Sequence, residues 1–111
     1  MRRDESYLLD ILIAARRAIS HLDGIQSKTF EESALLQDAV VRALEVVGEA
    51  AGHLSKEFRD SHPEIPWHKM VGMRNRLIHE YFRVNYAAVW DTVTNDLPDL
   101  IKILENLVPS D

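Results

Sequence analysis

Hydrophobic residues recur along most of the chain at three- and four-residue intervals, the spacing that places them on one face of an α-helix. The first stripe begins at Asp4 or Ser6, either of which can cap a helix, and it ends near Leu22. Its apolar members are Tyr7, Leu8, Ile11, Leu12, Ala15, Ala18, Ile19 and Leu22. The pattern predicts an amphipathic helix that opens the chain.

A second helix is predicted over roughly Glu31–Phe58, with Thr29 or Ser33 as its cap. It carries two apolar rows, which indicate two neighbours: Leu36, Val40, Ala43, Leu44, Val47, Ala51 and Leu54, and then Leu35, Ala39, Val46 and Ala50. Gly48 and Gly52 each cost about 1 kcal/mol relative to alanine within a helix. Either another backbone approaches them closely, or they are tolerated near a fraying end.

The remaining pattern predicts an extended loop and two more helices. Pro63 and Pro66 fall in the loop, and the third helix covers Trp67 to about Tyr81. Asn85 is the expected N-cap of the last helix, whose apolar stripe keeps its register through Pro98. We therefore expect an all-α fold whose last helix is kinked at Pro98.

Composition narrows the class of protein. A chain of 111 residues with 46% hydrophobic and 28% charged residues is typical of a single globular domain, here 1–111. The absence of cysteine excludes disulfides, thiolate metal sites and a cysteine nucleophile. No stretch is apolar enough for a signal peptide or a membrane span, so we expect a cytoplasmic protein without a membrane partner.

The net charge of −5 argues against broad electrostatic binding to nucleic acid. The charge is nevertheless uneven, because segment 67–83 contains Lys69, Arg74, Arg76 and Arg83 but only one acidic residue, Glu80. Such a local basic patch can hold a phosphate at one place. An ordinary basic surface patch explains the charge equally well.

Arg74 lies in the middle of the apolar side of the third predicted helix. Its neighbours on that side are Met70, Met73, Leu77, Ile78 and Tyr81. Burying a guanidinium without a partner is costly, and Glu45 and Glu49 on the second helix are the candidate partners. The pair is either a structural ion pair or part of a functional site.

His79 lies on the other side of that helix, near Asn75 and Arg76, with Gly72 two turns below. These residues form a small polar recess suited to a phosphate, unless His79 is simply a surface or core histidine. Arg74 and His79 are about 140° apart on an ideal helix and do not point at one atom. A distorted helix end, the length of arginine, or a second copy across a two-fold axis would resolve this, and the spare apolar row favours a homodimer.

Other chemistries lack their residues in this sequence. No serine occupies a nucleophile elbow, no glycine-rich loop would cradle a phosphate, and no HExxH motif is present. The histidines are too scattered for a convincing metal site. We therefore expect neither a metal ion nor a cofactor.

The segment Met73–Phe82 has an arginine followed directly by asparagine, then a histidine five residues after the arginine and a tyrosine two after the histidine. This pattern resembles the signature of HEPN ribonucleases, and especially the HepT-type toxins. The likeness extends over most of the chain, including segments 44–51, 63–67 and 89–98, although Arg83 stands where glycine is expected. It implies an antiparallel four- to five-helix bundle that dimerises with two motifs facing one cleft.

The resemblance also implies metal-independent cleavage of RNA, in which the ribose 2′-hydroxyl attacks the adjacent phosphate. His79 would transfer a proton, Arg74 would stabilise the phosphorane and Asn75 would orient either group. The expected substrate-binding residues are Lys69, Arg76, Glu45 and Glu49.

Similar toxins are silenced by a minimal nucleotidyltransferase antitoxin that attaches AMP to the motif tyrosine, here Tyr81. Tyr81 could instead be only the last core aromatic residue of its helix. The rival functional hypothesis is a non-catalytic HEPN dimer that serves as the binding partner of a nucleotidyltransferase. A third is a helical interaction protein in which Arg74 only pairs with a glutamate.

Overall fold

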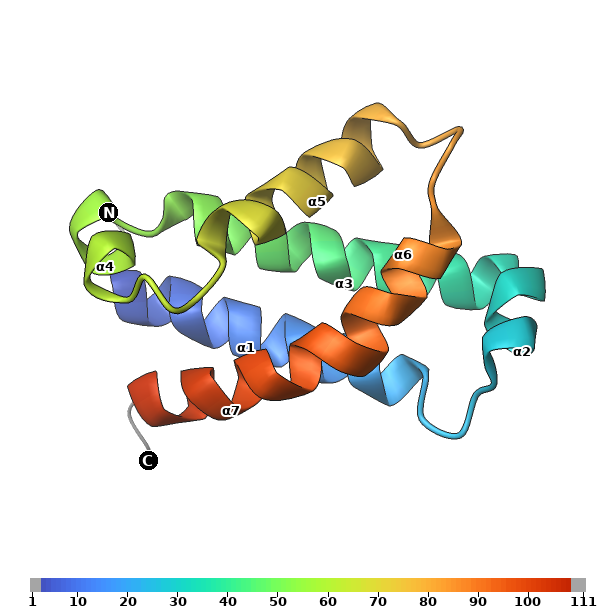
Figure 1. Ribbon diagram of the computed structural model, residues 1–111, viewed down its shortest axis with the longest axis horizontal. Helices are drawn as coiled ribbons and strands as arrows, with labels where there is room; N and C mark the ends of the chain where they lie inside the picture. The colour runs from blue at the N-terminus through green and yellow to red at the C-terminus, as the bar shows by residue number, and fades with distance from the viewer. Residues whose placement is uncertain (1–2, 109–111) are drawn as a thin grey trace.

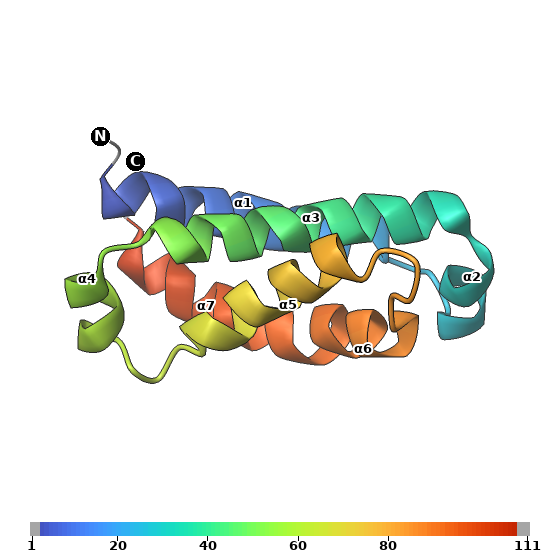
Figure 2. The same cartoon turned by 90° about the horizontal axis from the view of Figure 1, so that it is seen from above.

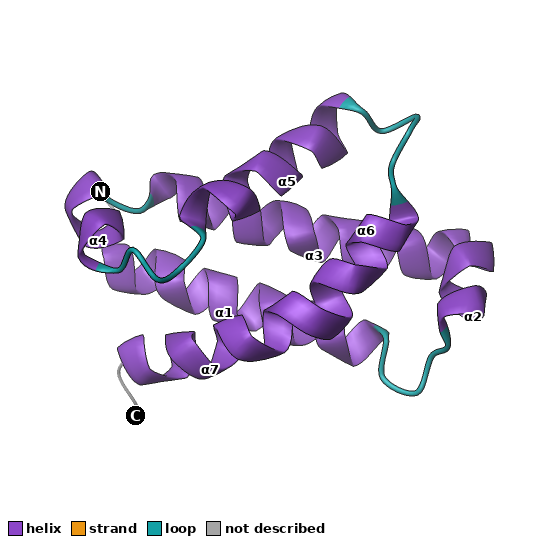
Figure 3. Cartoon of the chain, viewed as in Figure 1, coloured by secondary structure: helices purple, strands orange, loops and turns teal. Residues whose placement is uncertain are grey.

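The computed structural model describes residues 3–108, and these form helices joined by loops, with no strand among them (Figure 3). The all-α prediction is therefore confirmed. The elements are α1 (Asp4–His21), α2 (Ser27–Glu32), α3 (Ala34–His53), α4 (Lys56–Ser61), α5 (Trp67–His79), α6 (Tyr86–Asp91), the π-helical segment η1 (Thr92–Asp96) and α7 (Leu97–Leu107). Within this described part of the chain, no helix has the length and apolar character needed to cross a membrane.

The long helices alternate in direction and form the antiparallel bundle that was predicted (Figures 1 and 2). Helix α3 is central, since it packs against both α1 and α5, while α7 packs against α1. The bundle closes around a core that includes Leu8, Ile11, Phe30, Val40, Leu44, Val47, Val89 and Leu104. Neighbours within the same chain thus account for most of the apolar surface of α3, although Leu35 stays 80% exposed.

The start of α1 differs from the prediction. Its N-cap is Arg3, which makes no side-chain capping bond, so neither Asp4 nor Ser6 caps the helix. The Asp4 carboxylate instead accepts hydrogen bonds from the Ser55 backbone N–H at 2.9 Å and from the Ser55 hydroxyl at 2.7 Å. Asp4 therefore ties the first turn of α1 to the corner between α3 and α4.

The predicted second helix, Glu31–Phe58, is wrong in extent, because two serine caps divide that stretch. Ser33 Oγ accepts from the Leu36 N–H at 3.1 Å and begins α3, as one of the two expected caps. Ser55 Oγ accepts from the Phe58 N–H at 3.1 Å and begins α4. These side chains satisfy backbone donors that a continuous helix would use, and thereby favour a new helix start.

The last helix begins as predicted, with Asn85 Oδ1 accepting from the Ala88 N–H at 3.0 Å. Its change of direction occurs through η1, immediately before Pro98 in the first turn of α7 (Figure 1). Proline has no N–H to donate to the preceding turn and its ring crowds that turn, so a local widening to π-helical geometry accommodates it.

Candidate active site

Helices α3 and α5 approach each other closely at Gly48. A Cβ atom there would lie 2.6 Å from the Met70 carbonyl oxygen and would also overlap the Cβ of Arg74. At Gly52 an added Cβ would meet only Val71 Cγ2, at 3.8 Å, which is ordinary contact. The close approach by another backbone is thus confirmed for Gly48, but that backbone is α5 of the same chain. Gly48 is buried and is not available to a second copy.

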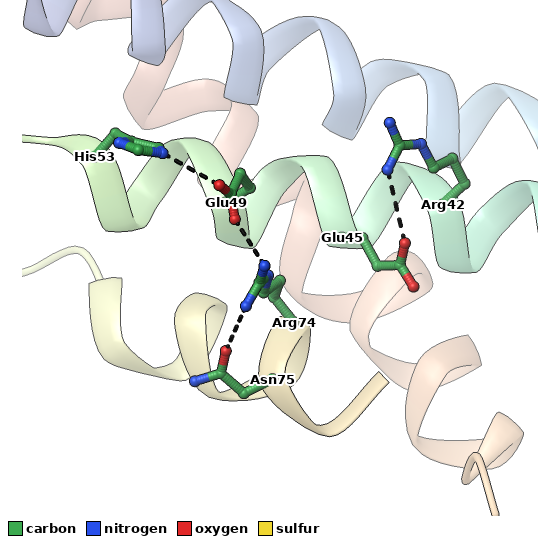
Figure 4. A network of polar contacts seen from close by, with 6 residues as sticks. All are labelled: Arg42, Glu45, Glu49, His53, Arg74 and Asn75. Carbon is green, nitrogen blue, oxygen red and sulfur yellow. Dashed lines mark hydrogen bonds and ion pairs between the residues drawn. The ribbon is translucent and has the colours of Figure 1, made fainter. Parts of the chain in front are cut away.

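The contact at Gly48 brings Arg74 beside the polar side of α3 (Figure 4). Arg74 Nη2 lies 3.0 Å from Glu49 Oε2, and Arg74 Nη1 donates to Asn75 Oδ1 at 3.0 Å. The other Glu49 oxygen, Oε1, lies 3.1 Å from His53 Nε2. We call these four side chains, His53, Glu49, Arg74 and Asn75, the Arg74 network.

Of the two carboxylates expected to pair with Arg74, only Glu49 does so. Glu45 lies 3.8 Å from Arg42 Nη1, three residues earlier on the same helix, which holds its carboxylate away from Arg74 (Figure 4). One nitrogen of Arg74, Nε, is buried without a hydrogen-bond partner among the described residues. Glu49 and Asn75 therefore hold the two terminal nitrogens of the guanidinium, whereas its Nε–H has no hydrogen-bond acceptor among the described residues.

A cavity of about 320 Å³ adjoins the Arg74 network between α1, α3 and α5. Glu45, Glu49, His53 and Arg74 line it, together with residues of α1 that include Tyr7 and Asp10. The Tyr7 and His53 rings are stacked, with centroids 5.1 Å apart. Sequence reasoning did not assign His53 to the site, although its position four residues after Glu49 allows such a contact on a helix.

The remaining predicted substrate-binding residues lie elsewhere. Lys69 and Arg76 line a separate groove of about 820 Å³ between α5 and the α6–α7 segment, as does Gly72. Asn75, in contrast, is engaged by Arg74. Asn75 and His79 do not line that groove, so of the recess expected around His79 only Arg76 and Gly72 share one pocket.

His79 is the last residue of α5, and its side chain is exposed. The imidazole of His79 makes no hydrogen bond or ion pair with any other side chain or backbone group in the described range 3–108. The structure thus brings Arg74, Asn75 and Glu49 together but leaves His79 outside that network.

Tyr81 lies beyond the end of α5 and is 64% exposed. The interpretation of Tyr81 as the last core aromatic residue of its helix is wrong, because the helix ends at His79, two residues earlier. Its ring packs only partly, against Phe82. Its hydroxyl-bearing side chain is therefore accessible from outside the bundle.

Across residues 3–108, no group of three or more histidine, cysteine, aspartate or glutamate side chains is arranged to hold a metal ion. The chemistry visible on α5 consists of a held guanidinium, its amide neighbour and an exposed imidazole. Together they provide a cation for an anionic group and a side chain able to transfer protons.

Comparison with known proteins identifies the family. The model of the HepT-like ribonuclease family matches residues 11–107. A Thermococcus cleftensis protein named as a probable ribonuclease HepT is 40% identical over 106 residues, covering 96% of each chain. A Caldanaerobacter subterraneus protein, named as an RNase by inference, is 40% identical over 108 residues, covering 97% of this chain and 96% of its own. No solved structure matches the chain. The chain belongs to the HepT-like ribonuclease family.

Proposed function

We propose that this protein is an endoribonuclease that cleaves RNA without a metal ion. The observation that carries the proposal is that Arg74, held by Glu49 of α3 and by Asn75, lies on the same helix as His79 in a member of a ribonuclease family. Names of relatives that refer to RNase activity support the same reaction class. Since imidazole can move protons and guanidinium can stabilise phosphoryl charge, these groups can perform the reaction themselves.

In the proposed reaction, a base removes the proton from a ribose 2′-hydroxyl, whose oxygen attacks the neighbouring phosphorus. The bond to the 5′-oxygen of the next nucleotide breaks, and an acid gives that oxygen a proton. The products are a cyclic phosphate and a 5′-hydroxyl. Arg74 stabilises the charge that develops on the phosphoryl oxygens, Asn75 keeps Arg74 oriented, and His79 transfers protons.

The proposed active form is a homodimer, because one His79 can serve as the base and His79 of the partner subunit as the acid. Half-exposed Leu9 and Ile13 on α1 lie on the surface that offers apolar area for such contact. Ile13 lines a hollow of about 410 Å³ that shares Asp10, Arg42 and Val46 with the cavity beside Arg74. A second copy bound there would lie beside the cavity that Arg74 lines.

We further propose that the protein is the toxin of a cytoplasmic toxin–antitoxin pair whose antitoxin is a minimal nucleotidyltransferase. The antitoxin would transfer AMP from ATP to the Tyr81 hydroxyl and release pyrophosphate. The 64% exposure of Tyr81 supports this, since the oxygen can be reached without unfolding α5. The transferred phosphate would lie near the basic residues of the motif and compete with RNA.

The decisive test is cleavage of single-stranded and tRNA-like RNA in the presence of EDTA, followed by analysis of the product ends. A cyclic phosphate and a 5′-hydroxyl are expected. If the purified dimer binds a nucleotidyltransferase but leaves every RNA intact, the non-catalytic binding partner is the correct function. If cleavage occurs only with added magnesium, the proposed mechanism is wrong.

A further inference from the structure

Two large aromatic side chains are exposed directly after the helix that carries His79. Tyr81 is 64% exposed and Phe82 is 86% exposed. Their rings lie beside each other, with centroids 4.2 Å apart and planes inclined by 44°. Burying a phenylalanine side chain is worth about 1.5–3 kcal/mol, so leaving Phe82 in water forgoes stability that the bundle could have gained.

The backbone holds the pair at the tip of a tight turn. The Arg83 N–H donates to the Glu80 carbonyl oxygen at 2.8 Å, which places Tyr81 and Phe82 at the two central positions. Those positions usually carry glycine, proline, asparagine, aspartate or serine. Two aromatic residues at this tip are therefore not explained by the needs of the turn.

The surroundings of the pair are polar and mainly basic. His79, Arg83 and Arg76 are exposed in the same segment, and Glu80 is its only acidic residue. The residues that flank the rings in the chain, His79 and Glu80 before them and Arg83 after them, are exposed and charged or ionisable. Aromatic rings between cationic side chains are typical of surfaces that stack the bases of single-stranded nucleic acid and neutralise its phosphates.

We propose that Phe82, with Tyr81 beside it, forms a stacking subsite for one unpaired base of the RNA substrate, next to the phosphate at His79. The inference rests on the proposed ribonuclease function and adds the form of substrate. A base inside a duplex already has both faces stacked, so only an unpaired base can use the Phe82 ring. The subsite therefore selects single-stranded segments and loops.

The test measures binding of a short single-stranded RNA whose 2′-hydroxyls are all replaced by fluorine, so that it cannot be cleaved. Stacking on an aromatic residue contributes about 1–3 kcal/mol per base, so Phe82→Ala should weaken binding about 5- to 150-fold. Phe82→Trp should retain or strengthen binding. Leu35→Ala is the matched control, because Leu35 is 80% exposed on α3 and lies outside the motif.

A second arm replaces single bases of the same RNA with abasic sites. In the unmodified protein, one position should account for most of the lost affinity, and that loss should vanish in Phe82→Ala. Because Phe82 is exposed, its replacement should leave the helical content and the unfolding midpoint unchanged.

Three results would overturn the inference in different ways. Equal binding by Phe82→Ala and the unmodified protein means that the ring does not stack on RNA. A loss of RNA binding that follows a loss of self-association, seen by sedimentation, means that the pair is a subunit contact. If the unmodified protein binds none of the RNAs, the proposed ribonuclease function fails together with the subsite.

Discussion

The two ends of the α5 motif differ in how firmly the protein holds them. Arg74 is packed against Gly48, paired with Glu49 and bonded to Asn75. His79 is exposed at the end of the helix and has no polar partner within residues 3–108. Under the proposed mechanism, folding alone preorganises Arg74, the proposed charge-stabilising group, whereas we expect His79, the proposed proton-transfer group, to be positioned by substrate or by a second copy.

This division has a physical basis. A cation stabilises a transition state best when its orientation is fixed before the reaction, because no further reorganisation is then needed. A proton-transfer group acts on atoms that the substrate brings, so its useful geometry depends on the bound substrate. Tyr81 and Phe82 lie in the turn that follows the end of α5, where both side chains are exposed.

Among substitutions in the Arg74 network, Arg74→Ala should reduce the cleavage rate most. Loss of a preorganised charge-stabilising donor reduces the cleavage rate about 100- to 1000-fold. The free energy of unfolding should fall by only about 1 kcal/mol, because the ion pair with Glu49 is partly exposed. Arg16→Ala is the control, since Arg16 also forms an ion pair, with Glu105 at 2.6 Å, between α1 and α7. Equal cleavage by the two variants would remove Arg74 from the mechanism.

Gly48→Ala should destabilise the fold by about 2–3 kcal/mol, because the new methyl group would force α5 away from α3. Gly52→Ala provides a matched comparison on the same helix. Its methyl group meets only ordinary contact, and alanine favours the helix by up to about 1 kcal/mol, so stability should be unchanged or higher. Urea unfolding of both variants measures the difference. A similar loss in both would show that α3 and α5 are not held together at Gly48.

His53→Ala should have a smaller effect, at most about 5-fold on the cleavage rate, because the His53–Glu49 contact is about half exposed and such a pair contributes up to about 1 kcal/mol. Glu49 would lose the partner that fixes its Oε1 and would orient Arg74 less firmly. His62→Ala is the control, since His62 also stacks on an aromatic ring, that of Phe58 at 4.4 Å, but lies outside the Arg74 network. Parallel rate measurements decide whether the network extends to His53, and equal rates in the two variants would exclude it.

Periodicity in the sequence was sufficient to predict an all-α fold and the pairing of Arg74, whereas the antiparallel bundle was expected from the family resemblance. A guanidinium among apolar residues requires a nearby acid, and the polar side of the second predicted helix supplied Glu49. The glycine at position 48 likewise indicated close contact between backbones. Sequence alone did not reveal that α5 of the same chain makes this contact, because one apolar row fits an internal neighbour or a second copy equally well.

The helix ends were harder to predict, and they decide the form of the site. The caps at Ser33 and Ser55 divided a stretch whose apolar spacing was continuous. The end of α5 at His79 moved Tyr81 out of the core, and the rotation of the helix placed Arg76 and Asn75 in different environments. These outcomes depend on competition among local hydrogen bonds, which periodicity does not record.

The most direct measurement compares His79→Ala with the unmodified protein in both cleavage and stability. We expect the cleavage rate in EDTA to fall about 100- to 10,000-fold, because general acid–base catalysis is lost. The free energy of unfolding should not change, since His79 is exposed and has no polar partner in the described chain. A variant that cleaves RNA as fast as the unmodified protein would contradict the division of α5 into a held cation and a free proton-transfer group.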